Sequence, residues 1–230
     1  MFQEACRTVR ESVYGLVARI KIKKGKRIEV ACSNGSGFMI SPGIIATAAH
    51  ITHKGNMTKP NHTEFLVIRA PDIGSSFEKA TLLAEDKVKD IAFLKIDKPK
   101  STISLTLEES IVPRGTNCGS LGFPLAVVKF HKNGRMQYSA YERFLGGHVS
   151  HYAHFIPGDY YQYETDYIVY GGSSGCPGFL LNGNVIGLQK GTVPSPKQKT
   201  RSAESGRIAI SRLVPSTDII DFANRNGIKL

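Results

Sequence analysis

Gly172-Ser173-Ser174-Gly175-Cys176-Pro177 is the stretch that decides the fold, and two shorter stretches precede it, Thr47-Ala48-Ala49-His50 and Asp90-Ile91-Ala92. A serine hydroxyl is a weak nucleophile until a base takes its proton, and an imidazole oriented by a carboxylate is such a base. The chain order histidine, aspartate, serine is that of a two-barrel fold and differs from the orders used by α/β folds. We therefore expect Ser174 to be a nucleophile, His50 its base and Asp90 the orienting carboxylate.

Each of these signals is weak by itself. A serine between glycines commonly marks a turn, a lone histidine is more often structural than catalytic, and Asp90 could cap the strand that follows it. The combination of all three in one order, at spacings that suit two consecutive barrels, favours a catalytic site. His50 and Asp90 fall in the first half of the chain and Ser174 in the second, so the cleft between the barrels is where they would meet.

Strand signals, which are β-branched residues and alternation between turn residues, run along nearly the whole chain. They predict an all-β protein with two six-stranded antiparallel β-barrels, a short N-terminal helix and a C-terminal helix. Within the first barrel, separate strands are expected at 27–32 and 37–41. The expected parts of this single domain, in chain order, are a helix at 1–12, a barrel at 13–97, a linker at 98–114, a barrel at 115–212 and a helix at 213–230.

The glycines around Ser174 have a chemical purpose. A turn that directs two backbone N–H groups toward one point needs unusual backbone angles and no Cβ in the way. The N–H groups of Gly172 and Ser174 are therefore expected to form an oxyanion hole. The alternative for Gly171-Gly172 is a flexible loop, and a resting form could hold this turn collapsed.

These motifs resemble the trypsin-like serine proteases of the chymotrypsin fold, and most of all the protease domain of the HtrA family. The resemblance rests on Gly35–Ser41 with Ile44–His50, on Asp90–Lys95 and on Thr165–Pro177, and it covers about residues 13 to 226. It implies a serine endopeptidase with a polypeptide substrate, no cofactor and no metal. The chain departs from the family where Cys176 replaces a glycine and Tyr170-Gly171 replaces Asn-Pro, and it stops where an HtrA protein continues into a PDZ domain.

The resemblance also locates the specificity pocket. In this fold the residue six positions before the nucleophile lies at the base of the pocket, and here that residue is Ile168. An apolar base cannot compensate a buried lysine or arginine, so we expect cleavage after apolar residues and expect Asp166 to lie outside the pocket. Thr192 is a candidate pocket wall, and Leu188–Gly191 is the strand expected to pair with the substrate backbone. The other substrate-binding residues that we expect are Tyr170, Gln189, Lys190 and Gly191.

Other residues suggest chemistry that we do not favour. His148, His151 and His154 recur every third residue, but in a strand this spacing puts neighbours on opposite faces, and no carboxylate or cysteine pattern accompanies them. Cys176 could be a nucleophile, although a small buried packing residue is the better interpretation. With Cys6, Cys32 and Cys118 it makes four cysteines, an even number that permits disulfides, but we expect reduced thiols.

Composition constrains location and partners. The chain of 230 residues is 41% hydrophobic, has no apolar run long enough to span a membrane, and begins without the pattern of a signal peptide, so we expect a cytoplasmic protein. Its formal charge is +11, with basic clusters at Lys21–Arg27 and Lys197–Arg201. The simplest explanation is solvated basic loops. An acidic regulatory partner and self-association are further expectations, whereas nucleic acid and membrane are not expected as partners.

Two other functions compete with an active endopeptidase. One is a catalytically weak or inactive protease-fold module that binds acidic peptides or nucleic acid, against which the intact triad argues. The other is a processing protease of viral or defence origin, which shares the chemistry and differs only in substrate. Because secreted relatives carry an aspartate where this chain has Ser173, activation by N-terminal cleavage is not expected. Control by ordering of Gly171-Gly172 and of the basic loop Gly191–Gly206 is expected instead.

Overall fold

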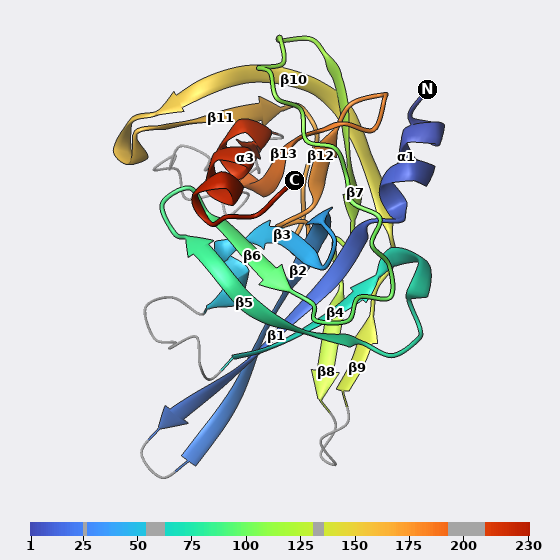
Figure 1. Ribbon diagram of the computed structural model, residues 1–230, viewed down its shortest axis with the longest axis vertical. Coiled ribbons are helices and arrows are strands. Elements are labelled where there is room, and N and C mark those ends of the chain that lie inside the picture. Colours follow the sequence, from blue (N-terminus) through green and yellow to red (C-terminus); the bar gives the residue numbers. More distant parts are fainter. Residues whose placement is uncertain (25–26, 54–62, 131–135, 193–209) are drawn as a thin grey trace, which may run out of the picture.

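Two closed six-stranded antiparallel barrels make up the protein. The computed structural model describes residues 1–24, 27–53, 63–130, 136–192 and 210–230. Figure 1 shows the blue and green strands of the first barrel below the yellow and orange strands of the second. The predicted all-β, two-barrel fold class is confirmed.

The first barrel consists of strands whose neighbours follow the order β1-β2-β3-β6-β5-β4, and β4 pairs with β1 to close it. A four-residue helix, α2 (Ala49–Thr52), follows β3, and a 3₁₀ turn, η3 (Ala70–Asp72), follows β4. The strands are β1 (Val13–Lys24), β2 (Arg27–Ser41), β3 (Ile44–Ala48), β4 (Thr63–Arg69), β5 (Glu78–Asp86) and β6 (Ile91–Lys95).

Strand β2 corrects one prediction, because a single strand replaces the two that we expect at 27–32 and 37–41. Its glycines allow close approach of other groups instead of making a turn. A Cβ on Gly35 would lie 2.9 Å from the Ser174 carbonyl oxygen, and one on Gly37 would lie 2.9 Å from that of Ala46. Strand β2 therefore continues in extended form past the nucleophile.

The second barrel has the order β10-β11-β14-β13-β12-β7, closed by the pairing of β7 with β10. A separate two-stranded sheet, β8 (Val127–Phe130) with β9 (Met136–Ser139), projects from it beside the first barrel (Figure 1). The 3₁₀ turn η4 (Ile156–Gly158) joins β10 to β11. The barrel strands are β7 (Asn117–Gly122), β10 (Arg143–Phe155), β11 (Tyr160–Thr165), β12 (Pro177–Phe179), β13 (Val185–Thr192) and β14 (Ser211–Pro215).

One helix lies at each end of the chain, as predicted. Helix α1 (Phe2–Arg10) buries Ala5 and Val9, which are four residues apart and so share one helix face. Helix α3 (Ser216–Arg225) packs against β13 and β14, and its Phe222 ring lies 4.7 Å from that of Phe93 in the first barrel. Among the described residues, no helix has both the length and the apolar character needed to cross a membrane.

Candidate active site

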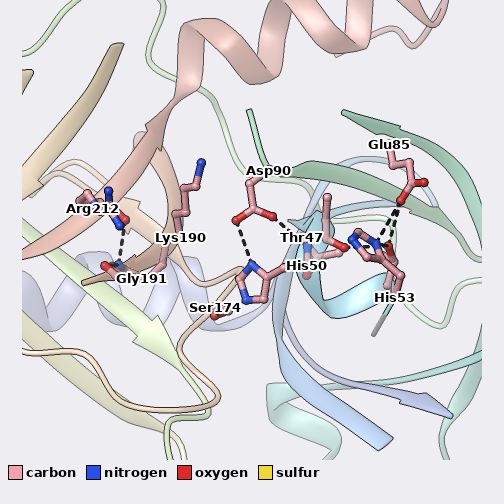
Figure 2. A network of polar contacts seen from close by, with 12 residues as sticks. Thr47, His50, His53, Glu85, Asp90, Ser174, Lys190, Gly191 and Arg212 are labelled. Carbon is pink, nitrogen blue, oxygen red and sulfur yellow. Dashed lines mark hydrogen bonds and ion pairs between the residues drawn. The ribbon is translucent and has the colours of Figure 1, made fainter. Parts of the chain in front are cut away.

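His50 is held from two directions by one carboxylate. It lies in α2, directly after β3, and its backbone N–H donates to Asp90 Oδ1 at 2.8 Å. The ring Nδ1 lies 2.8 Å from Asp90 Oδ2 (Figure 2). Because a carboxylate beside Nδ1 stabilises the proton there, Nε2 is left free to accept one.

Asp90 reaches this position from a strained turn between β5 and β6. Its φ of 67° lies in the left-handed region, which aspartate tolerates better than most residues. The turn is braced by Asp86, whose Oδ1 accepts from the N–H groups of Val88 and Lys89, both at 3.0 Å. Asp90 itself is buried, at 7% exposure, so little solvent competes for its oxygens.

Ser174 completes the arrangement from the second barrel. Its Oγ lies 2.8 Å from His50 Nε2, opposite the Asp90 side of the ring. The three residues singled out in the sequence are therefore brought into one hydrogen-bonded chain from Asp90 through His50 to Ser174 (Figure 2).

The carbonyl groups of Gly171 and Gly172, just before Ser174, both accept hydrogen bonds. The Gly171 oxygen accepts from the Leu125 N–H at 2.6 Å, and the Gly172 oxygen accepts from Ser36 Oγ at 2.9 Å. Gly172 has φ +94°, and a Cβ there would lie 2.4 Å from the Phe123 oxygen. No acceptor within the described part of the chain pairs with the N–H groups of Gly172 and Ser174, so both donors stay available.

Ser36 is a site residue that sequence reasoning missed. It is fully buried in β2, yet it contacts the second barrel three times. Its N–H donates to the Ser174 oxygen at 2.8 Å, its Oγ donates to Gly172, and the same Oγ accepts from the Phe123 N–H at 3.1 Å. The flanking glycines in Gly35-Ser36-Gly37 were the available signal, because they mark close backbone approach.

Comparison with known proteins agrees with this geometry. The family model described as a trypsin-like peptidase domain matches residues 35–188. The chain belongs to the trypsin-like peptidase family. Similar relatives include bovine "Serine protease HTRA2, mitochondrial" (29% identity over 205 residues) and human "Serine protease HTRA3" (35% over 162 residues). A third is "Probable periplasmic serine endoprotease DegP-like" from Pseudomonas savastanoi pv. phaseolicola (29% over 212 residues).

The alignments cover 87%, 69% and 88% of this chain but 38%, 33% and 36% of the three relatives. The chain thus spans about a third of their length. The predicted resemblance to HtrA proteases is confirmed over most of the chain, and the comparisons support the serine endopeptidase class.

Ile168 and Tyr170 precede Ser174 by six and four residues in this trypsin-like peptidase, and both are 40% exposed. Their neighbours Tyr167 and Val169 are buried in the core of the second barrel. Alternate residues of this segment thus face the interior and the surface. Ile168 and Tyr170 are on the accessible side, where a substrate could touch them.

Gln189 corrects an expectation, because the structure does not bring its side chain to the cleft. The side chain is fully buried, and its Nε2 donates to the carbonyl oxygens of Gly191 and Arg212 at 3.1 and 2.9 Å. Its backbone is also occupied, since its N–H donates to Cys176 and its oxygen accepts from Gly175. Gln189 therefore supports the nucleophile turn through its backbone contacts with Gly175 and Cys176.

Lys190 and Gly191 follow Gln189 in β13, and both are partly exposed. Lys190 Nζ donates to the Tyr160 hydroxyl at 2.7 Å and lies 4.6 Å from the centre of that ring. Thr192, the candidate wall, accepts from Arg212 through its carbonyl oxygen. The rest of the expected regulatory loop, 193–206, lies outside the described residues, as does the basic cluster at 197–201.

Two of the three spaced histidines contact carboxylates within their own barrel. His148 Nδ1 lies 3.0 Å from Asp166 Oδ2, and His154 Nε2 lies 3.0 Å from Asp159 Oδ1. Partial burial acts to raise the pKa of Asp166, but the hydrogen bonds from the His148 amide and ring outweigh it, and the pKa lies below its usual range. Asp166 is thus engaged by His148. In the described part of the chain no cluster of three potential ligands could hold a metal.

All four cysteines are free thiols. Cys176 is buried two residues after Ser174, beneath Gly122, and burial raises the pKa of its thiol to about 11. Burial likewise raises the pKa of Cys118 to about 12. Since the thiolate is the reactive form, neither cysteine has the character of a nucleophile.

The difference in exposure between Cys32 and the two buried cysteines predicts the order of thiol modification. With iodoacetamide at about pH 8, Cys32, which is exposed, should react first in the native protein, whereas Cys118 and Cys176 should react after unfolding in denaturant. Mass spectrometry of peptides from timed samples measures this order. Rapid alkylation of Cys176 in the native protein would contradict its assignment as a buried packing residue.

Proposed function

We propose that this chain is a serine endopeptidase that cleaves polypeptides through an acyl-enzyme intermediate. The observation that carries the proposal is the hydrogen-bonded chain Asp90–His50–Ser174. His50 Nε2 takes the Ser174 proton as Oγ attacks the scissile carbonyl, and Asp90 stabilises the imidazolium that forms. His50 then gives the proton to the leaving amine. Water, activated by the same imidazole, releases the acyl group.

The N–H groups of Gly172 and Ser174 are our candidates for stabilising the oxyanion of the tetrahedral intermediate. Two observations support this role. Neither N–H group has an acceptor within the described residues, and hydrogen bonds to the Gly171 and Gly172 carbonyl groups hold the turn in place. Donors fixed before the reaction stabilise developing charge without reorganising.

A fluorophosphonate probe tests the proposed function directly, because it reacts with an activated serine. The native protein should be labelled stoichiometrically at Ser174, and the Ser174→Ala variant should not be labelled. Peptide mapping of the labelled protein locates the modification. A native, folded protein that stays unlabelled would contradict the proposal and would favour a binding module.

We further propose cleavage after apolar residues such as Val, Leu, Ile or Met, with Ile168 as the determinant. Ile168→Asp should shift the preference toward Lys or Arg at the cleaved position by about tenfold or more, because a carboxylate there would compensate the buried cation. Profiling with a peptide library measures the shift. Asp166→Asn is the matched control and should leave the profile unchanged, since this carboxylate is engaged by His148. A native profile already dominated by Lys or Arg would contradict the apolar pocket.

The net charge of +11 favours an acidic partner. We propose that binding of an acidic ligand or of a second copy of the chain raises activity. Attraction between such charges weakens as salt is added. The cytoplasmic location stays a prediction.

A further inference from the structure

The helix that carries His50 is too short to hold itself in place. α2 has four residues, and a single turn lacks the cooperative hydrogen bonds that stabilise longer helices. No disulfide braces it, because all four cysteines of the chain are free. Since an error of about 1 Å in a catalytic group can cost on the order of 100-fold in rate, other contacts must fix this helix.

The β5–β6 hairpin contacts α2 at both ends. At the start of the helix, the Ala49 N–H donates to the Asp90 oxygen at 3.2 Å and the His50 N–H donates to Asp90 Oδ1. At its end, Thr52 Oγ1 donates to Glu85 Oε2 at 3.1 Å. Glu85 and Asp90 are five residues apart, on the two sides of one turn. One hairpin thus supplies a carboxylate to each end of the helix.

Glu85 makes a second contact with the same end of α2. Its Oε2 lies 3.5 Å from His53 Nδ1, which is also 3.2 Å from Thr52 Oγ1, and its Oε1 lies 3.2 Å from Lys87 Nζ. The side chains of His53 and Glu85 are 19% and 18% exposed, so solvent screens them little. Figure 2 shows this pair on the far side of His50 from Asp90 and Ser174.

The Thr52 hydroxyl connects the pair to the helix backbone. It lies 2.8 Å from the Ala49 oxygen as well as 3.1 Å from Glu85, and it is buried at 2% exposure. One hydroxyl proton serves two acceptors, so the negative charge of Glu85 decides how Thr52 is oriented. Without the Glu85 carboxylate the hydroxyl keeps the Ala49 oxygen as its acceptor, but the end of α2 loses this contact with the hairpin.

We propose that Glu85 is a positioning residue for His50, acting through Thr52 and His53. It fixes the end of α2 while Asp90 fixes its start. This inference rests on the proposed serine protease function. Glu85 does not touch the reacting atoms, and its effect is on the fraction of molecules in which His50 Nε2 is aligned with Ser174 Oγ.

The test measures fluorophosphonate labelling together with kcat and KM for a peptide substrate. Glu85→Gln and Thr52→Val should each lower the labelling rate and kcat by about ten- to a hundredfold with KM little changed. Thr52→Ser keeps the hydroxyl and should restore at least half of the native rate. Glu64→Gln is the matched control, because Glu64 makes ion pairs with Arg19 and Lys79 in β1 and β5, away from α2. It should behave as the native protein does.

The losses in the double variant Thr52→Val/Glu85→Gln should be smaller than the product of the two single losses, because each single variant already disturbs the contact between Thr52 and Glu85. Near-native labelling by the folded Thr52→Val and Glu85→Gln variants would overturn the positioning role. Equal losses in Thr52→Val and Thr52→Ser would also overturn it. Thr52→Val keeps shape and volume, so it remains informative if Glu85→Gln fails to fold. Failure of the native protein to be labelled would instead overturn the proposed function.

Discussion

Replacing Ser174 by alanine should lower kcat for peptide cleavage by about 10⁴-fold or more, and His50→Ala should have an effect of similar size. The reason is that Ser174 Oγ and His50 Nε2, 2.8 Å apart, act as one unit. The double variant should therefore be no slower than the worse single variant. Asp90→Ala should also be severely impaired, since it leaves His50 without its partner at Nδ1. Progress curves with a fluorogenic peptide measure all of these rates.

Two controls make this test decisive. Circular dichroism and thermal unfolding should show that the Ser174→Ala and His50→Ala variants remain folded, because His50 is exposed and Ser174 is only partly buried. Purification of every variant in parallel with the native protein controls for contaminating proteases. Cleavage retained by pure Ser174→Ala protein would rule out the assigned nucleophile.

Gly172→Ala should lower kcat by about 10²- to 10³-fold, the size expected for losing an oxyanion donor. Gly172 has φ +94°, and an added Cβ would lie 2.4 Å from the Phe123 oxygen and 3.3 Å from the Leu125 nitrogen. The turn must therefore move, and its N–H group moves with it. Steady-state kinetics should show most of the loss in kcat, because the oxyanion exists in the transition state and not in the bound substrate.

Gly115→Ala separates this effect from backbone strain alone. Gly115 also has a left-handed φ, +81°, but an added Cβ would meet nothing within 4 Å. Both variants should lose stability, since alanine is disfavoured at positive φ. Gly115→Ala should keep its kcat, whereas Gly172→Ala should not. Equal kcat values in the two variants would contradict the role proposed for the Gly172 N–H.

The parts of the site that the sequence predicted are those encoded in short, local motifs. His50 follows a buried strand, Asp90 opens one, and Ser174 lies between glycines, so each is recognisable without its partners. The order of the motifs then indicated two barrels and a shared cleft, because this order is tied to that fold. The fold class could be predicted for the same reason.

The residues that were missed depend on contacts between distant segments. The role of Ser36 comes from hydrogen bonds to Ser174, Gly172 and Phe123, and these segments come together only when the barrels pack. Gln189 was expected to bind substrate because it lies in Leu188–Gly191, the strand expected to pair with the substrate backbone. The register shifts between Gln189 and Gly191, however, and such a bulge interrupts the alternation of faces that a sequence pattern assumes. Glu85 was also missed, because it lies in none of the sequence motifs that identified the site.

The contacts of Ser36 have a consequence for the order in which the chain becomes active. A serine of the first barrel holds the backbone of the nucleophile turn, and Gly175 in that turn also donates to Gln189 in β13. During synthesis, residues before Gln189 can therefore form the first barrel and bring His50 to Asp90 without building a working nucleophile. We expect a growing chain to be inactive until β13 has been synthesised, a safeguard against cleavage of itself and of its neighbours. Truncated chains that end before β13 should accordingly fold in part, and fluorophosphonate labelling of such chains, expected to be absent, measures whether this safeguard exists.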